Sequence, residues 1–252
     1  SLGFVPTMGS LHKGHISLIK KSLKECNKTI VSIFINPTQF NNKKDFKNYP
    51  RNNKKDLSIL RKLKINFVYL PNVKDVYYFK RKSPIKLKKK DKILCAKFRK
   101  GHFEGVIDVV ERLIKIIKPQ KIYFGKKDFQ QLYLVKKYIP RKYNVKIISC
   151  PTIRNEYKLA FSSRNKLLNK NQLIKAEKIS KEIFLFKKKI SRNISISKQI
   201  FKQKKKLIDL FNIKFDYFEL RNMSNLKVSN KVKSSKLFVA YYIDKVRLID
   251  NF

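Results

Sequence analysis

The chain is poor in acidic residues, in glycine and in cysteine. Of its 252 residues, 17 are Asp or Glu and 62 are Lys or Arg, so the formal net charge is +45. No apolar run approaches the ~18 residues that a membrane span needs, so we expect no membrane partner. The three cysteines, Cys26, Cys95 and Cys150, lie far apart without CxxC spacing. That excludes a disulfide framework and a zinc site, and it favours the reducing cytoplasm.

The start of the chain carries no secretory signal pattern. It opens at Ser1 directly on an apolar stretch, so we expect a few residues to precede it in the complete protein. We therefore expect a cytoplasmic protein.

The excess positive charge at first favours a nucleic-acid partner or an anionic membrane surface. However, 51 of the basic residues are Lys and 11 are Arg, whereas specific readers of phosphates and bases rely on the arginine fork. We interpret the charge as a compositional bias spread over the surface and expect no specific nucleic-acid partner. An RNA-binding module is an alternative, for which residues 77–82 (YYFKRK) are a weak candidate.

Strand and helix patterns alternate along the first two thirds of the chain, which predicts an open, doubly wound parallel sheet. A basic run at 80–92 and a polar stretch at 40–51 are expected to be surface loops, and a phosphate-attracting flap is the alternative for the basic run. The expected strands are 2–7, 29–35, 66–70, 121–125 and 145–150, and the expected helices are 14–27, 54–64, 106–117 and 128–139.

The pattern of predicted elements changes after about residue 168. Two Lys-rich amphipathic helices, 171–189 and 195–210, precede three strand patterns, at 215–221, 236–243 and 246–249. We therefore predict two domains: residues 1–168, an α/β domain, and residues 169–252, a smaller α+β domain.

The scarce residues gather in the first half. All six glycines and all three histidines lie at or before Gly125, and most stand in polar clusters that follow a predicted strand. In open α/β sheets ligands bind beyond the carboxyl ends of the strands. The clusters are PTMGSLHKGH (6–15), NPTQF (36–40), GKKDFQQ (125–131), PTIR (151–154) and FSSRN (161–165). Neutral and cationic side chains there predict an anion-binding cleft.

His12 and His15 are the clearest candidates for catalytic residues. Their i, i+3 spacing at a helix start puts both rings on one side, where imidazoles and uncommitted helix N–H groups can bind a phosphate. Gly9 and Gly14 leave room for a nucleotide. The alternatives are capping or surface histidines, or half of a metal site without an evident third ligand.

Lys127 and Arg164 offer positive charge for phosphate oxygens. Gln39 and Gln131 carry neutral amides that suit a small hydroxy acid. Surface or core-edge roles are the alternative for each glutamine alone, and any single lysine carries little weight among 51.

Together these motifs resemble the pantothenate synthetase (pantoate–β-alanine ligase) family of the HxGH nucleotidyltransferase superfamily. The likeness runs along essentially the whole chain. It is carried by FVPTMGSLHKGHISLI (4–19), NPTQF (36–40), DFKNYPR (45–51), RKGHFEGV (99–106), FGKKDFQQL (124–132), PTIRNEYKLAFSSRN (151–165) and RLIDN (247–251).

The resemblance implies a Rossmann-like N-terminal domain, a smaller C-terminal lid and a homodimer. It implies that ATP and (R)-pantoate react with Mg²⁺ to give pantoyl adenylate and pyrophosphate, and that β-alanine then releases pantothenate and AMP. Another HxGH nucleotidyltransferase with a different acceptor is the alternative, but a phosphorylated acceptor favours Arg or Lys where the glutamines stand.

The resemblance also assigns roles to individual residues. His12 and His15 would contact the ATP phosphates, with His15 as the proton donor. Gln39 and Gln131 would bind pantoate, with Gln39 also near β-alanine. The other implied ATP contacts are Met8, Gly9, Gly125, Lys127, Asp128, Ile153, Ser162, Ser163 and Arg164.

The chain departs from the family pattern at several positions. Lys126 stands where the family usually has an acidic residue, and Tyr157 and Lys158 stand where it usually has Asp-Gly. Asp244 and Val246 replace an expected Gly and Thr before RLIDN, and Ala96 replaces an expected Gly. We expect these changes to affect loop rates and stability more than the reaction.

Overall fold

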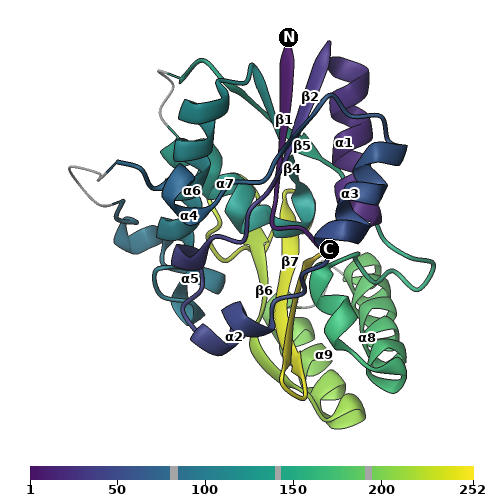
Figure 1. Cartoon of the computed structure of the whole chain (residues 1–252). Helices are drawn as coiled ribbons and strands as arrows, with labels where there is room; N and C mark the ends of the chain where they lie inside the picture. The colour runs from purple at the N-terminus through teal and green to yellow at the C-terminus, as the bar shows by residue number, and fades with distance from the viewer. Residues whose placement is uncertain (80–84, 140–142, 191–194) are drawn as a thin grey trace. The chain divides into compact units, whose positions relative to one another are not determined.

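A computed structural model describes residues 1–79, 85–139, 143–190 and 195–252 (Figure 1). Its contacts divide the chain into two compact units, Ser1–Ile153 and Arg154–Phe252. The division falls earlier than residue 168, and the domain boundary at 168 stays a prediction.

The first unit contains a five-stranded parallel sheet in the order β3-β2-β1-β4-β5. Helices lie on both of its faces, with α1 and α3 on one side and α6 and α7 on the other (Figure 1). This arrangement confirms the predicted α/β class. The strands are β1 (Leu2–Thr7), β2 (Lys28–Ile33), β3 (Phe67–Tyr69), β4 (Lys121–Gly125) and β5 (Lys146–Cys150).

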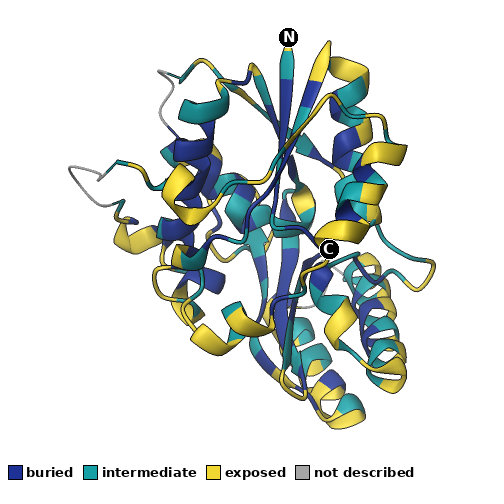
Figure 2. Ribbon diagram, viewed as in Figure 1, coloured by how far each residue is buried: buried dark blue, intermediate teal, exposed yellow. Residues whose placement is uncertain are grey.

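Helices of different lengths connect these strands. The longest, α6, is amphipathic and buries most of its residues, as the dark blue ribbon in Figure 2 indicates. The helices are α1 (Lys13–Glu25), α2 (Lys43–Asn48), α3 (Asn53–Lys62), α4 (Val73–Val76), α5 (Cys95–Phe98), α6 (His102–Ile117) and α7 (Phe129–Tyr138), with 3-10 turns η1 (Pro37–Gln39), η2 (Lys89–Asp91) and η3 (Lys126–Asp128).

Two close approaches explain why glycine is needed where it occurs. A Cβ at Gly3 would lie 2.1 Å from the Ser22 hydroxyl oxygen, so the bare backbone lets α1 pack on β1. A Cβ at Gly105 would lie 2.4 Å from the Thr38 carbonyl oxygen, so the absence of a side chain at Gly105 lets α6 pack on η1. Ordinary turns are therefore not the only use of the scarce glycines.

The expected loop at 40–51 is wrong in part, because α2 lies within it. The Asn42 side chain accepts a hydrogen bond from the Lys44 N–H and starts the helix, and the Phe46 ring packs edge-on against Phe40. Six residues are too few for an apolar period to reveal a helix.

The basic run at 80–92 is described only from residue 85 onward, and 80–84 lie outside the described residues. The described lysines of this run are exposed, as expected, but Leu87 and Asp91 are buried. Among the described residues no helix is long and apolar enough to span a membrane.

The second unit contains an antiparallel sheet in the order β6-β7-β8, with β6 (Lys214–Asn222), β7 (Ser235–Ile243) and β8 (Val246–Asn251). Two helices, α8 (Lys170–Lys189) and α9 (Ile196–Phe211), pack on it around a core that includes Ile179, Ile183 and Leu207. The turn η5 (Ser163–Leu167) precedes α8. The predicted α+β class of this part is confirmed.

Candidate active site

The carboxyl edge of the parallel sheet carries four of the five predicted clusters. Thr7 pairs with Ile33 at the ends of β1 and β2, and Gly125 pairs with Cys150 at the ends of β4 and β5. Successive connections lead from β1 toward β3, whereas β4 and β5 lie on the other side of β1. The strand order therefore reverses between β1 and β4, where ligands bind in such sheets.

The segment after β1, residues 8–15, is called here the histidine loop. His12 is the N-cap residue of α1, and its Nδ1 accepts a hydrogen bond from the Gly14 N–H at 3.1 Å. The rings of His12 and His15 are stacked, with centroids 4.0 Å apart and planes at 29°. Since Nδ1 accepts, the proton of neutral His12 is on Nε2, which is a donor.

The same contacts correct one expectation about this loop. The Gly9 N–H donates to the Thr7 hydroxyl at 3.1 Å, and the Ser10 and Leu11 N–H groups donate to Asp56 at 2.7 and 2.8 Å. Gly9, Ser10 and Leu11 precede α1, so the expectation of uncommitted helix N–H groups fails at Gly14, whose N–H is bound to His12. The N–H groups of Gly9, Ser10, Leu11 and Gly14 are thus bound within the protein, and the imidazole rings of His12 and His15 are groups that the histidine loop can offer to an anion.

The other predicted residues of the first unit lie at the same sheet edge. In η3, Lys127 is mostly covered, and its Nζ lies 3.1 Å from Asp128 Oδ1. Gly125 ends β4, and Ile153 follows β5 in a half-buried position. Half-buried Met8 begins the histidine loop directly after β1.

The two predicted glutamines lie in different settings. Gln39 is buried in η1, where its Nε2 is 2.7 Å from the Met8 sulfur and its Oε1 is 3.3 Å from Asn36 Nδ2. Gln131 is half-buried on α7. Its neighbour Gln130 is a core-edge amide, with hydrogen bonds to the backbone of Cys95 and Ile93. The structure brings Gln39 to the histidine loop.

A buried histidine fixes the turn that carries Gln39. His102 Nδ1 lies 2.6 Å from the Gln39 carbonyl oxygen, and its Nε2 lies 2.9 Å from Arg99 Nη1. A carbonyl only accepts and a guanidinium only donates, so the neutral ring with a proton on Nδ1 satisfies both contacts. Arg99 also lies 3.8 Å from Asp45 of α2.

Three of the predicted ATP contacts, Ser162, Ser163 and Arg164, belong to the second unit. Residues 154–165, called here the serine segment, contain Ser162, whose hydroxyl accepts from the Arg164 N–H at 3.3 Å and starts η5. Ser163 is buried and Arg164 is half-buried. Arg154 binds Asp250 of β8 through two hydrogen bonds of 2.7 and 2.8 Å. PTIR and RLIDN thus meet in an ion pair that holds the serine segment.

Sequence analysis missed Asp56, which is 1% exposed and holds the histidine loop. It did not single out the Arg154–Asp250 pair either, although both residues stand in quoted motifs. The signal that could have found them is the scarcity of acidic residues. Asp56 and Asp250 are two of only 17 in the chain, and Arg154 is the partner of one of them.

The cysteines show no sign of nucleophilic use. None of the three forms a disulfide bond. Burial is the main cause that raises the pKa of Cys150, which stands at the end of β5. A raised pKa leaves little reactive thiolate at neutral pH.

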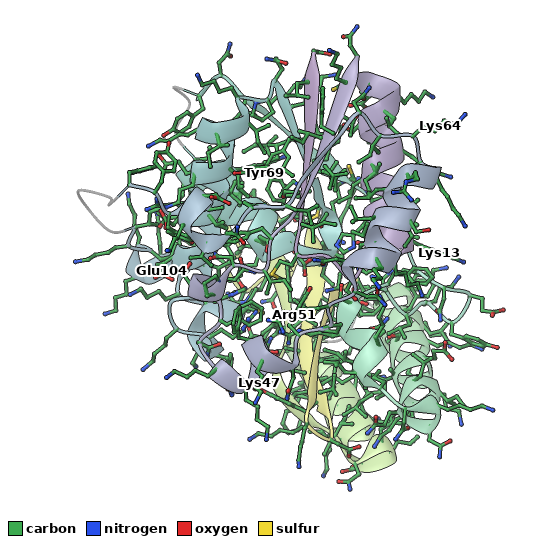
Figure 3. The ribbon with its side chains drawn as sticks, viewed as in Figure 1. Lys13, Lys47, Arg51, Lys64, Tyr69 and Glu104 are labelled. Carbon is green, nitrogen blue, oxygen red and sulfur yellow. The ribbon has the colours of Figure 1, made fainter. Side chains whose placement is uncertain are left out.

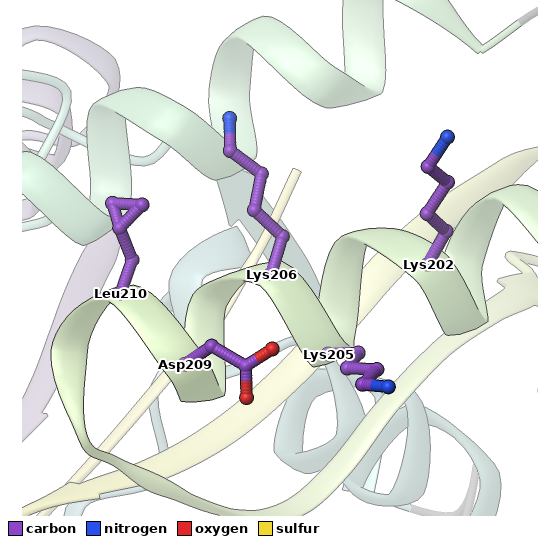
Figure 4. Close-up of a pocket in the computed structure, with 5 residues that line it drawn as sticks. All are labelled: Lys202, Lys205, Lys206, Asp209 and Leu210. Atoms are coloured by element: carbon purple, nitrogen blue, oxygen red, sulfur yellow. The ribbon is translucent and has the colours of Figure 1, made fainter.

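A hollow of about 550 Å³ lies on α9 of the second unit (Figure 4). Its lining comes from a single helix and consists of Lys202, Lys205, Lys206, Asp209 and Leu210. Exposed lysines occur over the whole chain, for example Lys13, Lys47 and Lys64 in Figure 3, so a lysine-lined hollow has no special chemistry. The edge of the parallel sheet remains the candidate active site.

Comparison with known proteins points in the same direction. The family model described as pantoate-beta-alanine ligase matches residues 1–252. A pantothenate synthetase of Sulfurihydrogenibium sp. (strain YO3AOP1) is 40% identical over 254 residues, covering 99% of this chain and 91% of that protein. One from Clostridium botulinum (strain 657 / Type Ba4) is 41% identical over 260 residues, covering 100% and 91%.

Solved structures agree. Pantothenate synthetase from Thermus thermophilus superposes with a TM-score of 0.90 at 30% identity, covering 100% of this chain and 92% of that one. Pantoate-beta-alanine ligase from Francisella tularensis, complexed with beta-gamma ATP and beta-alanine, has a TM-score of 0.83 at 40% identity, covering 100% and 88%.

Proposed function

The chain belongs to the pantoate-beta-alanine ligase family, and we propose that it uses ATP to join (R)-pantoate to β-alanine, giving pantothenate. In the first step a pantoate carboxylate oxygen attacks the α-phosphorus of ATP. The bond from that phosphorus to the bridging oxygen breaks, and pyrophosphate leaves. In the second step the β-alanine nitrogen attacks the acyl carbon, loses a proton and displaces AMP. A different acceptor on the same fold is not favoured by the family match.

The observation that carries this proposal is the stacked pair His12 and His15, 4.0 Å apart at the point where the strand order reverses. A carboxylate that approaches a triphosphate meets like charge, which donors and cations must neutralise. His12 presents Nε2 as a donor, and we assign His15 the role of proton donor to the phosphates.

Lys127 supports the same role from the neighbouring strand end. Its ammonium, already near Asp128, adds a compact positive charge for phosphate oxygens. Met8, Gly9, Gly125, Asp128 and Ile153 stand at the same edge of the first unit and are proposed as further ATP contacts. Ser162, Ser163 and Arg164 are proposed to contact the triphosphate from the serine segment.

Gln39 and Gln131 are proposed to bind pantoate, with Gln39 also near β-alanine. Neutral amides can bind the hydroxyl and carboxylate groups of a hydroxy acid without adding a phosphate site. For Gln39 this requires its side-chain contacts with Met8 and Asn36 to rearrange or be shared.

The protein itself supplies no covalent nucleophile in this scheme, which agrees with the raised pKa of the Cys150 thiol. Positioning and charge neutralisation replace covalent catalysis. The adenylate is a reactive anhydride, so exclusion of water has clear value, and the second unit is proposed as the lid.

Mg²⁺ is proposed as the accompanying ion. Across the described parts of the chain, no group of three or more His, Cys, Asp or Glu residues is placed to hold a metal ion. That fits an ion held chiefly by triphosphate oxygens and water, as Mg²⁺ commonly is. The ion would neutralise phosphate charge. The histidines and Lys127 would bind phosphate oxygens that the ion does not bind.

We further propose a homodimer in the cytoplasm. Three cysteines that form no disulfide with one another are typical of a reducing compartment. The interface between protomers is left open.

The experiment that tests the function is release of pyrophosphate from ATP with and without pantoate. We expect pantoate-dependent pyrophosphate without β-alanine, in an amount close to that of the enzyme, and continuous AMP formation once β-alanine is added. Pyrophosphate release that ignores pantoate would reject the proposed acceptor and leave only nucleotidyl transfer.

A further inference from the structure

The histidine loop has an unusual backbone. Gly9 and Ser10 are consecutive residues in the left-handed region, with φ of +75° and +53°. Glycine adopts this conformation readily, but for Ser10 it is strained because its Cβ crowds the backbone. The loop therefore needs contacts that stabilise this shape over others.

Asp56 supplies those contacts. Its side chain comes from α3, far away in sequence, and its residue is 1% exposed. Oδ2 accepts from the Ser10 N–H at 2.7 Å, and Oδ1 accepts from the Leu11 N–H at 2.8 Å. A Cβ at Gly9 would lie 2.9 Å from the same Oδ2, so the loop lies directly against the carboxylate.

This arrangement decides which groups of the loop face a ligand. Two N–H groups of the loop donate to the buried carboxylate, so they are already bound within the protein. The next residue, His12, then begins α1 with an extended backbone (φ −145°, ψ 174°), and its ring stacks on His15. The ring positions thus follow from the loop shape that Asp56 stabilises.

We infer that Asp56 is a positioning residue for the reaction: through two backbone hydrogen bonds it sets the conformation that places the His12 and His15 rings. The inference rests on the proposed function for its effect on catalysis. Its structural part, the link between Asp56 and the two rings, is testable without any substrate.

The test compares Asp56→Asn with Asp91→Asn. Asparagine keeps the size of the side chain, but its NH₂ group would face one of the two N–H donors. Asp91 is a matched control: it is buried in the same unit and accepts from Lys137 Nζ and the Tyr138 hydroxyl, each at 2.5 Å. Both variants lose a buried charged acceptor, and only one touches the histidine loop.

The first readout is imidazole NMR of the full chain without ligand. With three histidines in the chain, each resonance can be assigned, and His102 is an internal reference. We expect the His12 and His15 resonances to shift in Asp56→Asn and to stay in place in Asp91→Asn, with His102 unchanged in both.

The second readout is steady-state kinetics at a temperature where both variants are folded. A small misplacement of a reacting group costs on the order of 10²-fold, so we expect kcat/KM for ATP to fall about 10²-fold in Asp56→Asn. Asp91→Asn should keep kcat/KM near that of the unchanged protein.

Unshifted His12 and His15 resonances in folded Asp56→Asn would overturn the inference, and so would equal kinetic losses in the two variants. If Asp56→Asn does not fold, Gly9→Ala pushes on Oδ2 from the loop side and should shift the same two resonances. Lack of pantoate-dependent activity in the unchanged protein would reject the function but leave the NMR comparison standing.

Discussion

The histidine loop and the serine segment are each fixed by one mostly buried carboxylate, but the carboxylates bind different partners. Asp56 accepts from backbone N–H groups of the histidine loop. Asp250 binds the guanidinium of Arg154, which also donates to the carbonyls of Lys158 and Asn251. The first contact determines the shape of a loop, whereas the second determines where a segment is attached.

The difference follows from the chemistry of each segment. A loop that presents two imidazole rings needs one defined backbone conformation. Hydrogen bonds to two adjacent N–H groups stabilise that conformation over others. The serine segment is a small hairpin with its own bonds between Asn155 and Leu159, so it needs one strong attachment. A bidentate arginine fork provides such an attachment.

Asp250→Asn should have the largest effect, on stability. Asp250 is 6% and Arg154 17% exposed, and removal of one partner of a buried pair costs about 3–5 kcal/mol. We expect a clear fall in the free energy of unfolding, measured by denaturant titration followed by circular dichroism. Asp209→Asn, an exposed position on α9, is the control and should change little. Similar small losses in both would show that the fork does not hold the serine segment.

His15→Ala should have the next largest effect, on rate. Removal of one preorganised donor from a site that stabilises developing charge costs about 10²–10³-fold in kcat. Pre-steady-state pyrophosphate release measures the step concerned, and thermal unfolding should stay close to that of the unchanged chain. Lys13→Ala, at an exposed neighbouring position, is the matched control. Near-normal turnover of His15→Ala would reject the role of the histidine loop.

Lys127→Ala should lower kcat/KM for ATP by about 10- to 10²-fold, because a hydrogen bond to a charged group contributes about 1.5–3 kcal/mol. Its pair with Asp128 is partly exposed and should matter little for stability. Lys126→Ala removes the same charge from an exposed neighbour in η3. Equal kinetic losses in the two variants would mean that general attraction, rather than the position of Lys127, is responsible.

The smallest expected change is a gain. Lys158 has φ of +69°, and it stands where the family usually has glycine. Lys158→Gly relieves this strain, but it also gives the unfolded chain more conformational freedom. The net result should be a rise of up to about 1 kcal/mol in the free energy of unfolding. Lys158→Ala keeps a Cβ at the same position and should give no gain. Calorimetric melting of the two variants side by side measures the difference.

The positive φ of Lys158 gives a physical reason why the family favours glycine there, and the same reason holds at a second position where this chain departs. Asp244, where glycine is also favoured, has φ of +49°. The motif comparison identified both positions, but the sequence did not reveal that both are left-handed. Backbone dihedral angles in turns depend on the partners that hold the turn, and those partners are distant in sequence.

Much of the fold could be predicted from local patterns. The limits of β1 and β4 agree with the predicted ranges, since short apolar runs bounded by Pro, Gly or polar residues mark buried strands. The short helices α2, α4 and α5 were not predicted, because four to six residues contain too little periodicity. Their stability depends on caps and on packing rather than on an apolar stripe.

The sequence by itself determined the residue types of the candidate site and their order along the chain. His12, His15, Lys127 and the two glutamines could be named because each follows a predicted strand, and a parallel sheet gathers its strand ends at one edge. Tertiary structure alone decided how those groups are held: Asp56 reaches the histidine loop from α3, His102 reaches Gln39 from α6, and Arg154 reaches Asp250 across the second unit. The reason is that hydrogen bonds between distant segments exist only after the chain has brought them together, so no local pattern encodes them.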